Sequence, residues 1–295
     1  MFAAIRYKIQ NSWALVKASV AVLRADKELI IFPIVSSIGL FLVSVAFFAP
    51  MLVAGLFDSI FEGEAQIFGL VIGFMFYVVQ YTVIIFANSA LIGAAMIRLR
   101  GGDPTVADGF RIAAKHLGSI LGYALLSATV GMILRWISER GKGLGQFVSS
   151  ILGMAWNLAT YLVVPVLVIE GVGPWEAVKR SAGLLKTTWG EQLAGNFSIG
   201  AIFGLISVLA ILISIPIAFV LVAAELYALL IPLVVLLVVF FTLMGLISST
   251  LNGIYVAAVY RYAADGEAGG FFNEEMVRGA FRDKSSSRQT PRLTF

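Results

Sequence analysis

The sequence predicts an all-α protein, a polytopic transmembrane helix bundle with six spans. The 295-residue chain is 60% hydrophobic and only 13% charged, whereas soluble domains carry about 25% charged residues. The charged residues leave six long uncharged stretches, and most lysines and arginines fall on one side of the resulting topology. An apolar excess of this size needs a surface that faces lipid.

The six uncharged stretches are the predicted membrane spans, because a helix needs roughly 20 apolar residues to cross the hydrocarbon core. They are Leu29–Phe57, Ala65–Ile97, Leu117–Leu134, Gly143–Ile169, Gln192–Ala224 and Leu226–Tyr260. The third is the shortest, and Arg135 at its end can extend to the interface. Lipid offers the backbone no hydrogen-bond partners, so these runs must be helical. They also lack the alternation expected of a β-barrel.

The basic residues predict the orientation of the spans. Six spans leave both ends of the chain on one side, and that side carries 18 lysines and arginines against three on the other. The three are Arg135, Arg140 and Lys142. The positive-inside rule therefore predicts a multi-pass protein of the cytoplasmic (inner) membrane with both termini in the cytoplasm.

An amphipathic stretch precedes each odd-numbered span. In the first, apolar residues from Phe2 to Leu23 recur at steps of three and four, which predicts a helix at the membrane interface. The second is expected to start with Asp103 as N-cap and Pro104 as first helical residue, and the third with Pro174. A last amphipathic helix is expected at 271–283, followed by a disordered polar tail at 285–295.

These stretches divide the chain into three similar units. Val16-Lys17-Ala18-Ser19 aligns with Val178-Lys179-Arg180-Ser181, 162 residues later. The ends of two even-numbered spans, 94–98 and 257–261, also resemble each other. We therefore predict one transmembrane domain over 1–284, with units at about 1–100, 101–171 and 172–266, each an interfacial helix followed by a hairpin. Similar composition of interfacial helices is the alternative explanation.

Three asparagines form the candidate polar path. Asn88, Asn157 and Asn252 lie 13 or 14 residues before the glycine that follows each even-numbered span. Each therefore sits about 20 Å along its helix from that glycine. They can line a path for a small solute, or they can hydrogen-bond neighbouring helices and hold the bundle together.

The candidate membrane-interface residues are basic. They are Lys17, Arg24, Arg111, Lys179, Arg180 and Lys186. Their place at membrane edges indicates membrane lipids, including anionic lipids, as partners rather than nucleic acid. Glycine pairs at the small-xxx-small spacing, such as Gly69 with Gly73, favour close packing within the chain, and a homo-oligomer is the alternative.

The sequence offers little catalytic chemistry. It has no cysteine and a single histidine, His116, so thiolate and histidine metal clusters are excluded. No phosphate-binding loop or histidine-backed nucleophile is present. We therefore expect no cofactor, no metal and no catalytic residues. No ionisable residue lies in the middle of a span, which makes proton-coupled transport less favoured.

Two segments resemble a known family. The segments at 167–181 and 101–109 are similar to those of an uncharacterised family of prokaryotic six-span membrane proteins, and this resemblance covers nearly the whole chain. The Glu170-Gly171 element also resembles, over a short stretch, the membrane domain attached to some bacterial glycerophosphodiester phosphodiesterases. The first resemblance implies a cytoplasmic-membrane protein. Neither supplies catalytic residues to carry over.

Three functions remain open at this point. Passive transport or a channel for a small solute or lipid is favoured, because of the repeated units and the amides at matching depth. A membrane scaffold or lipid-binding assembly protein is the alternative. An enzyme acting on a lipid headgroup is the third.

Overall fold

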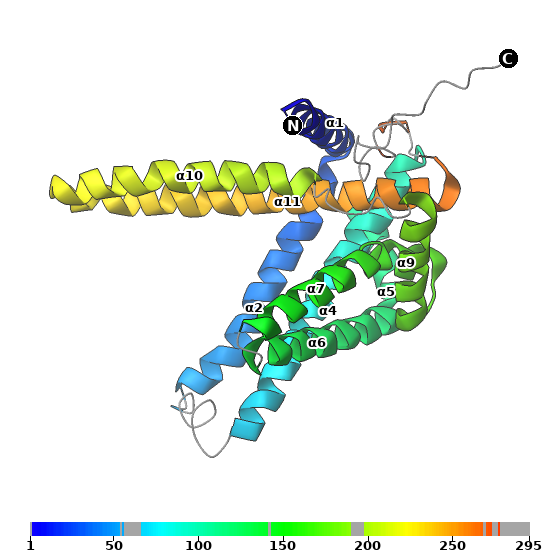
Figure 1. Ribbon diagram of the computed structural model, residues 1–295, viewed down its shortest axis with the longest axis horizontal. Coiled ribbons are helices and arrows are strands. Elements are labelled where there is room, and N and C mark those ends of the chain that lie inside the picture. The colour runs from blue at the N-terminus through cyan, green and yellow to red at the C-terminus, as the bar shows by residue number, and fades with distance from the viewer. Residues whose placement is uncertain are drawn as a thin grey trace. The chain divides into compact units, whose positions relative to one another are not determined.

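The computed structural model describes residues 2–53, 55, 66–140, 143–189, 198–267, 270–272 and 277. All regular structure in these residues is helical, which confirms the predicted fold class (Figure 1). Six of the helical segments are long and apolar enough to cross a membrane, at the six predicted positions. Apart from residues 271, 272 and 277, the helix expected at 271–283 and the tail at 285–295 lie outside the described residues.

The described helices form two compact units, which we treat separately. One unit contains residues 26–185 and the other contains residues 1–25 with 186–295. The larger unit holds the 3-10 helix η1 (Lys27–Ile30), α2 (Ile31–Val53), α4 (Gln66–Leu99), α5 (Val106–Lys115), α6 (Leu117–Arg140), α7 (Leu144–Ala159), α8 (Val163–Pro165), the π-helix η2 (Val166–Glu170) and most of α9 (Pro174–Trp189). The other holds α1 (Phe2–Ala25), α10 (Ser198–Ala223), η4 (Tyr227–Leu229) and α11 (Leu230–Asp265).

In the larger unit α4 is the central helix, since α2, α5 and α6 all pack against it. Gln80 of α4 donates a hydrogen bond to Ser44 Oγ of α2 at 3.0 Å, which links the first hairpin inside the membrane. Buried polar side chains in a bilayer commonly join helices in this way. The α2–α4 hairpin is therefore held by a polar contact as well as by apolar packing.

The amphipathic helix α5 packs on the hairpin that precedes it. The ring of Phe110 lies 5.1 Å from that of Phe32 in α2, and an added Cβ on Gly109 would come within 2.7 Å of the Ala90 carbonyl oxygen in α4. Only a glycine permits so close an approach of the two helices.

The start of α5 differs from the prediction. The N-cap is Thr105, not Asp103, because Thr105 Oγ1 accepts from the Asp108 N–H and the Asp108 carboxylate accepts from the Thr105 N–H. This reciprocal capping box satisfies two backbone donors at once, and the hydrogen bonds from Thr105 lower the pKa of Asp108. Asp103 instead pairs with Arg98 at 2.5 Å.

The fourth span is interrupted, whereas the sequence predicts one continuous helix. Helix α7 ends at Ala159, a turn follows, and the chain resumes as α8 and η2. Pro165 explains the break, because it has no N–H to offer the carbonyl four residues earlier. The Leu162 N–H, freed at the break, donates to Ser181 Oγ of α9 at 2.9 Å.

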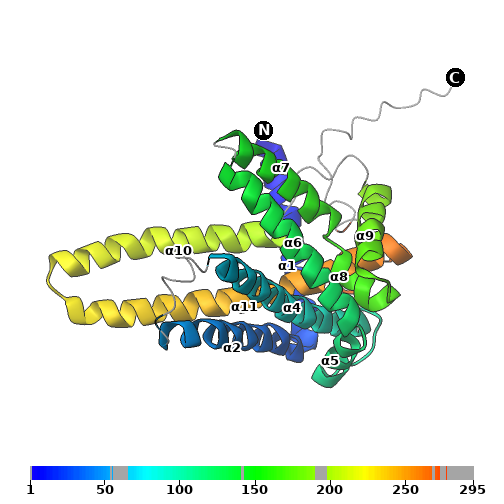
Figure 2. The same cartoon turned by 90° about the horizontal axis from the view of Figure 1, so that it is seen from below.

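In the second unit, α1 packs against both α10 and α11. The last two helices run side by side as a hairpin in both views (Figures 1 and 2). The buried face of α1 carries Leu15, Val16, Ala18, Ser19 and Val22. Helices α5 and α9 thus contact the hairpin before them, and α1 contacts the last hairpin.

A buried charge on this face of α1 should destabilise the unit. We expect Val22→Asp to cost on the order of 3 kcal/mol, because the carboxylate would lose its hydration without gaining a partner. That loss corresponds to a melting temperature lower by about 6–12 °C in detergent. Ala21→Asp, on the exposed side of the same helix, is the control and should change stability by less than about 0.5 kcal/mol. Equal melting temperatures for the two variants would contradict this packing.

Candidate amphiphile cleft

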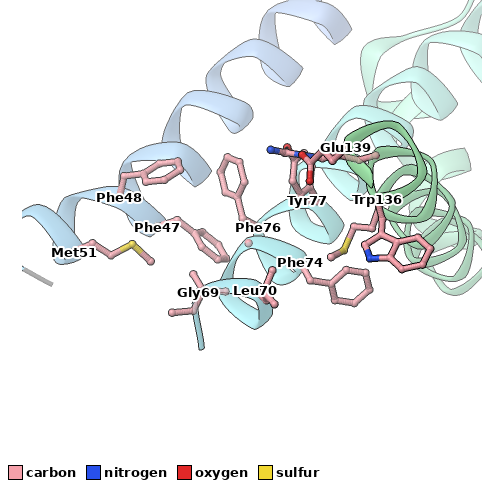
Figure 3. Close-up of a pocket in the computed structure, with 14 residues that line it drawn as sticks. Phe47, Phe48, Met51, Gly69, Leu70, Phe74, Phe76, Tyr77, Trp136 and Glu139 are labelled. Carbon is pink, nitrogen blue, oxygen red and sulfur yellow. The ribbon is translucent and has the colours of Figure 1, made fainter. Parts of the chain in front are cut away.

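A cleft of about 540 Å³ opens between α2, α4 and α6 in the larger unit (Figure 3). It lies at the C-terminal ends of α2 and α6 and the N-terminal end of α4, away from α5. Its volume falls within the range typical of small-molecule sites. The lining residues are Phe47, Phe48 and Met51 of α2; Gly69, Leu70, Ile72, Gly73, Phe74, Phe76 and Tyr77 of α4; and Met132, Arg135, Trp136 and Glu139 of α6.

Aromatic rings form the apolar wall of the cleft. The Phe76 ring lies 5.4 Å from that of Phe47 and 5.1 Å from that of Phe48, both edge to face. Tyr77 continues the row at 6.0 Å from Phe76. Edge-to-face pairs at these distances are favourable beyond their buried area, so the wall has a defined shape.

One side of the cleft is polar. Arg135 Nε donates to Glu139 Oε1 at 2.7 Å, and an Arg135 guanidinium nitrogen lies 3.4 Å from the Tyr77 hydroxyl. Both charged side chains remain largely exposed, at 66% for Arg135 and 61% for Glu139. An exposed pair contributes little to stability, so both groups are available to a ligand.

Gly73 leaves space in the cleft. A Cβ placed on Gly73 would meet no atom within 4 Å, and the same holds for Gly118 in α6. Close helix packing, expected at the small-xxx-small pairs, is therefore not seen at these two glycines. Gly122 does pack closely, since a Cβ there would lie 2.7 Å from Pro174 of α9.

The cleft combines an apolar wall with one cation and one carboxylate at its side. This chemistry suits an amphiphile, with an apolar chain against the rings and a polar group near Arg135 and Glu139. The described residues contain no group of three or more histidine, aspartate or glutamate side chains able to hold a metal ion.

The three predicted asparagines occupy different environments. Asn88 in α4 is half-buried, whereas Asn157 in α7 and Asn252 in α11 are exposed. No hydrogen bond joins Asn88 to Asn157 among the residues that the structure describes. Gln80 does link two helices through its hydrogen bond to Ser44, while the role of the asparagines as interhelical links stays a prediction. The polar path stays a prediction.

All six predicted interface residues are exposed. They are Lys17 and Arg24 of α1, Arg111 of α5, and Lys179, Arg180 and Lys186 of α9. Among the described residues, Arg111 pairs with Asp108 at 2.8 Å and Arg180 with Glu170 at 3.1 Å.

A buried ion pair that the sequence analysis missed lies just before the first span. The Asp26 side chain is only 4% exposed, and its Oδ2 lies 3.6 Å from Nε of Arg98 at the end of α4. Burial raises the pKa of Asp26, and the Arg98 charge opposes the shift. At the end of α5, His116 is half-buried, and burial lowers its pKa.

A family model matches residues 67–271, which is more than half of the chain. It describes a family of unknown function, DUF6159. The chain belongs to the DUF6159 family. This confirms the resemblance to an uncharacterised membrane family, and the six long apolar helices make this member a multi-pass membrane protein.

No match to the chain was found among the curated proteins or among the solved structures. The short resemblance to the phosphodiesterase-associated membrane domain therefore stays a prediction. The DUF6159 match includes α4 and α6, so it covers two of the three walls of the cleft, and it does not include α2.

The sequence analysis missed the cleft itself. The sequence places Arg135 at the end of the third span, as a residue that can extend to the interface and as one of three basic residues on that side, without Glu139 as its partner. Arg135 and Glu139 are four residues apart at the end of a span, and this spacing could have predicted their ion pair. The aromatic wall gave none, because phenylalanines within apolar stretches look alike whether they face lipid, protein or a cavity.

Proposed function

We propose that this DUF6159 member is a lipid-binding protein of the cytoplasmic membrane that holds one lipid in the cleft between α2, α4 and α6. The observation that supports the proposal is the pairing of an aromatic wall with the Arg135–Glu139 pair in one partly open cleft. An acyl chain would lie against Phe47, Phe48 and Phe76. The headgroup would lie at Arg135 and Glu139.

The geometry favours a lipid over a water-soluble ligand. The cleft opens among membrane-spanning helices near their ends, where the surrounding molecules are lipids and their headgroups. A guanidinium binds phosphate oxygens through several N–H donors. A neighbouring carboxylate can accept hydrogen bonds from an ammonium group on the same headgroup.

The proposed orientation places the cleft in the outer leaflet and both termini in the cytoplasm. It rests on the distribution of basic residues along the sequence. The cleft end of α6 also carries an interface anchor, since the Arg140 guanidinium lies 4.6 Å from the centre of the Trp136 ring. Tryptophan and arginine commonly mark the level of the headgroups.

Filling the cleft should remove the lipid. We expect Gly73→Leu to abolish retention of phosphatidylethanolamine, because its side chain would extend into open space among the cleft residues. The measurement is native mass spectrometry of delipidated protein titrated with this lipid. Gly118→Leu is the control, because it adds the same side chain into open space outside the cleft lining.

Arg135→Gln should weaken the same binding about tenfold or more, as expected for a lost charged hydrogen bond. Unchanged retention in Gly73→Leu, with Gly118→Leu equal to the unmodified protein, would rule out this cleft as the lipid site.

The orientation can be tested directly, because the chain has no cysteine. Single cysteines at Ala114 in α5 and Leu144 at the start of α7 are both at exposed positions. We expect a membrane-impermeant maleimide to label Leu144→Cys in intact spheroplasts and Ala114→Cys only after lysis. The reverse pattern would overturn the proposed orientation.

Transport is the second candidate function, and the interrupted fourth span favours it. Broken helices in membranes occur where the freed backbone groups are held by protein or face a cavity, and transporters use them at binding sites. The helix-ending glycines Gly101, Gly171 and Gly266 all have left-handed φ values, of 87°, 68° and 76°. This shared ending supports the proposed threefold repeat.

The transport proposal predicts that the three asparagines act together. We expect the triple change of Asn88, Asn157 and Asn252 to leucine to lower the flux of glycerol or of a fluorescent phosphatidylethanolamine across proteoliposome membranes. Leucine would remove the amide groups while the helices remain intact. Normal assembly with both fluxes unchanged would exclude the asparagine path. Gln80→Leu serves as a control for loss of an amide with a structural role.

A further inference from the structure

Two tryptophan–lysine pairs share one arrangement on the two amphipathic helices α1 and α9. In α1, the Lys17 ammonium lies 5.8 Å from the centre of the Trp13 ring. In α9, Lys179 lies 5.7 Å from that of Trp175. Both rings are exposed, at 50% and 58%. The second pair follows the first by 162 residues for the tryptophan and for the lysine alike.

Each pair lies on the face of its helix that is turned away from the protein. The opposite face of α1 buries Leu15, Ser19 and Val22, and that of α9 buries Ala177, Ser181 and Leu185. The buried faces fix the rotation of each helix about its own axis. The tryptophan and lysine are therefore presented outward by packing and not by a loose side chain.

The charges of these lysines are not neutralised within the described part of the chain. No ion pair of Lys17 or Lys179 with a carboxylate is found there, whereas the exposed cations Arg111 of α5 and Arg180 of α9 each have one. A lysine over a tryptophan ring keeps its charge and loses little of its freedom to bind an anion, since an exposed cation–π contact is weak.

Both helices lie on the same side of the membrane. Helix α1 precedes the first span, and α9 follows the fourth. An even number of spans separates them, so they face one compartment. The basic-residue distribution makes this the cytoplasmic side, where the leaflet carries anionic lipids.

We propose that each pair, Trp13 with Lys17 and Trp175 with Lys179, binds the phosphate of an anionic phospholipid of the cytoplasmic leaflet. The ring lies among the headgroups, as tryptophan does at membrane interfaces, and the ammonium donates to the phosphate oxygens. The two sites are distinct from the cleft, because none of the four residues lines it. This inference does not depend on a lipid occupying the cleft.

The test measures binding of phosphatidylglycerol and phosphatidylcholine to the full chain in a neutral detergent by native mass spectrometry. We expect the unmodified protein to prefer phosphatidylglycerol. Lys17→Gln and Lys179→Gln should each weaken one site about fivefold, and the double variant should lose the preference. Lys17→Arg with Lys179→Arg should retain it, because the charge is kept.

Arg111→Gln and Arg180→Gln are the matched controls, since each removes an exposed cation that already has a carboxylate partner. We expect both to keep the preference for phosphatidylglycerol. An equal loss in these controls would show diffuse attraction by surface charge and would overturn the proposal. So would an unchanged preference in the double glutamine variant.

Inorganic phosphate distinguishes a lipid site from a site for a free anion. We expect millimolar phosphate to leave phosphatidylglycerol binding unchanged, because the site needs the lipid to lie beside the ring at the interface. Full displacement at that concentration would assign the lysines to a free anion and overturn the proposal.

Discussion

A bilayer gives the peptide backbone no hydrogen-bond partner, and the described helices meet that requirement almost entirely within themselves. The fourth span is an exception, because Pro165 interrupts its i→i−4 backbone hydrogen bonds. There the Leu162 N–H reaches Ser181 Oγ in α9, a buried side chain. A break inside the membrane is thus made acceptable by a helix that lies outside the spans. Helix α9 therefore stabilises the preceding hairpin, because its Ser181 hydroxyl accepts a backbone hydrogen bond at the break.

The end of α4 satisfies the same requirement locally. The N–H groups of Arg100, Gly101 and Gly102 bond to the carbonyls of Met96, Arg98 and Ile97. Helix α5 packs on the side of α4 before this end, where Gly109 lets its backbone approach Ala90 closely. Helix α1 packs on the final hairpin although it is the first helix in the chain. The final hairpin thus packs against a segment that lies more than 170 residues earlier in the sequence.

The spans and their positions could be predicted from the sequence, because a helix that crosses the lipid must be a continuous run of apolar residues. The rest depends on finer or longer-range effects. The start of α5 was misplaced by two residues because both Asp103 and Thr105 are good N-caps, and only Thr105 has an acidic residue three positions later to complete a capping box. The break in the fourth span depends on Pro165 within it and also on Ser181, a residue after the span that accepts from the Leu162 N–H. The cleft draws on residues from Phe47 to Glu139. The sequence alone does not predict which faces of the apolar helices α2, α4 and α6 lie opposite one another.

The cleft and the amphipathic helices α1 and α9 carry basic residues in different states, and this difference bears on lipid preference. At the cleft, Arg135 already has Glu139 as a partner at 2.7 Å, so the pair as a whole has no net charge. A headgroup with both a phosphate and an ammonium can replace this contact with two others, whereas a purely anionic headgroup would meet the carboxylate. Lys17 and Lys179 lie over aromatic rings, and neither is paired with a carboxylate among the residues that the structure describes, so they favour net negative charge. If both proposals hold, one chain would select zwitterionic lipid in one leaflet and anionic lipid in the other. The selection would follow from whether a carboxylate is paired with the cation: Glu139 pairs with Arg135, whereas no pair of Lys179 with Glu176, one helical turn away, is found in the described part of the chain.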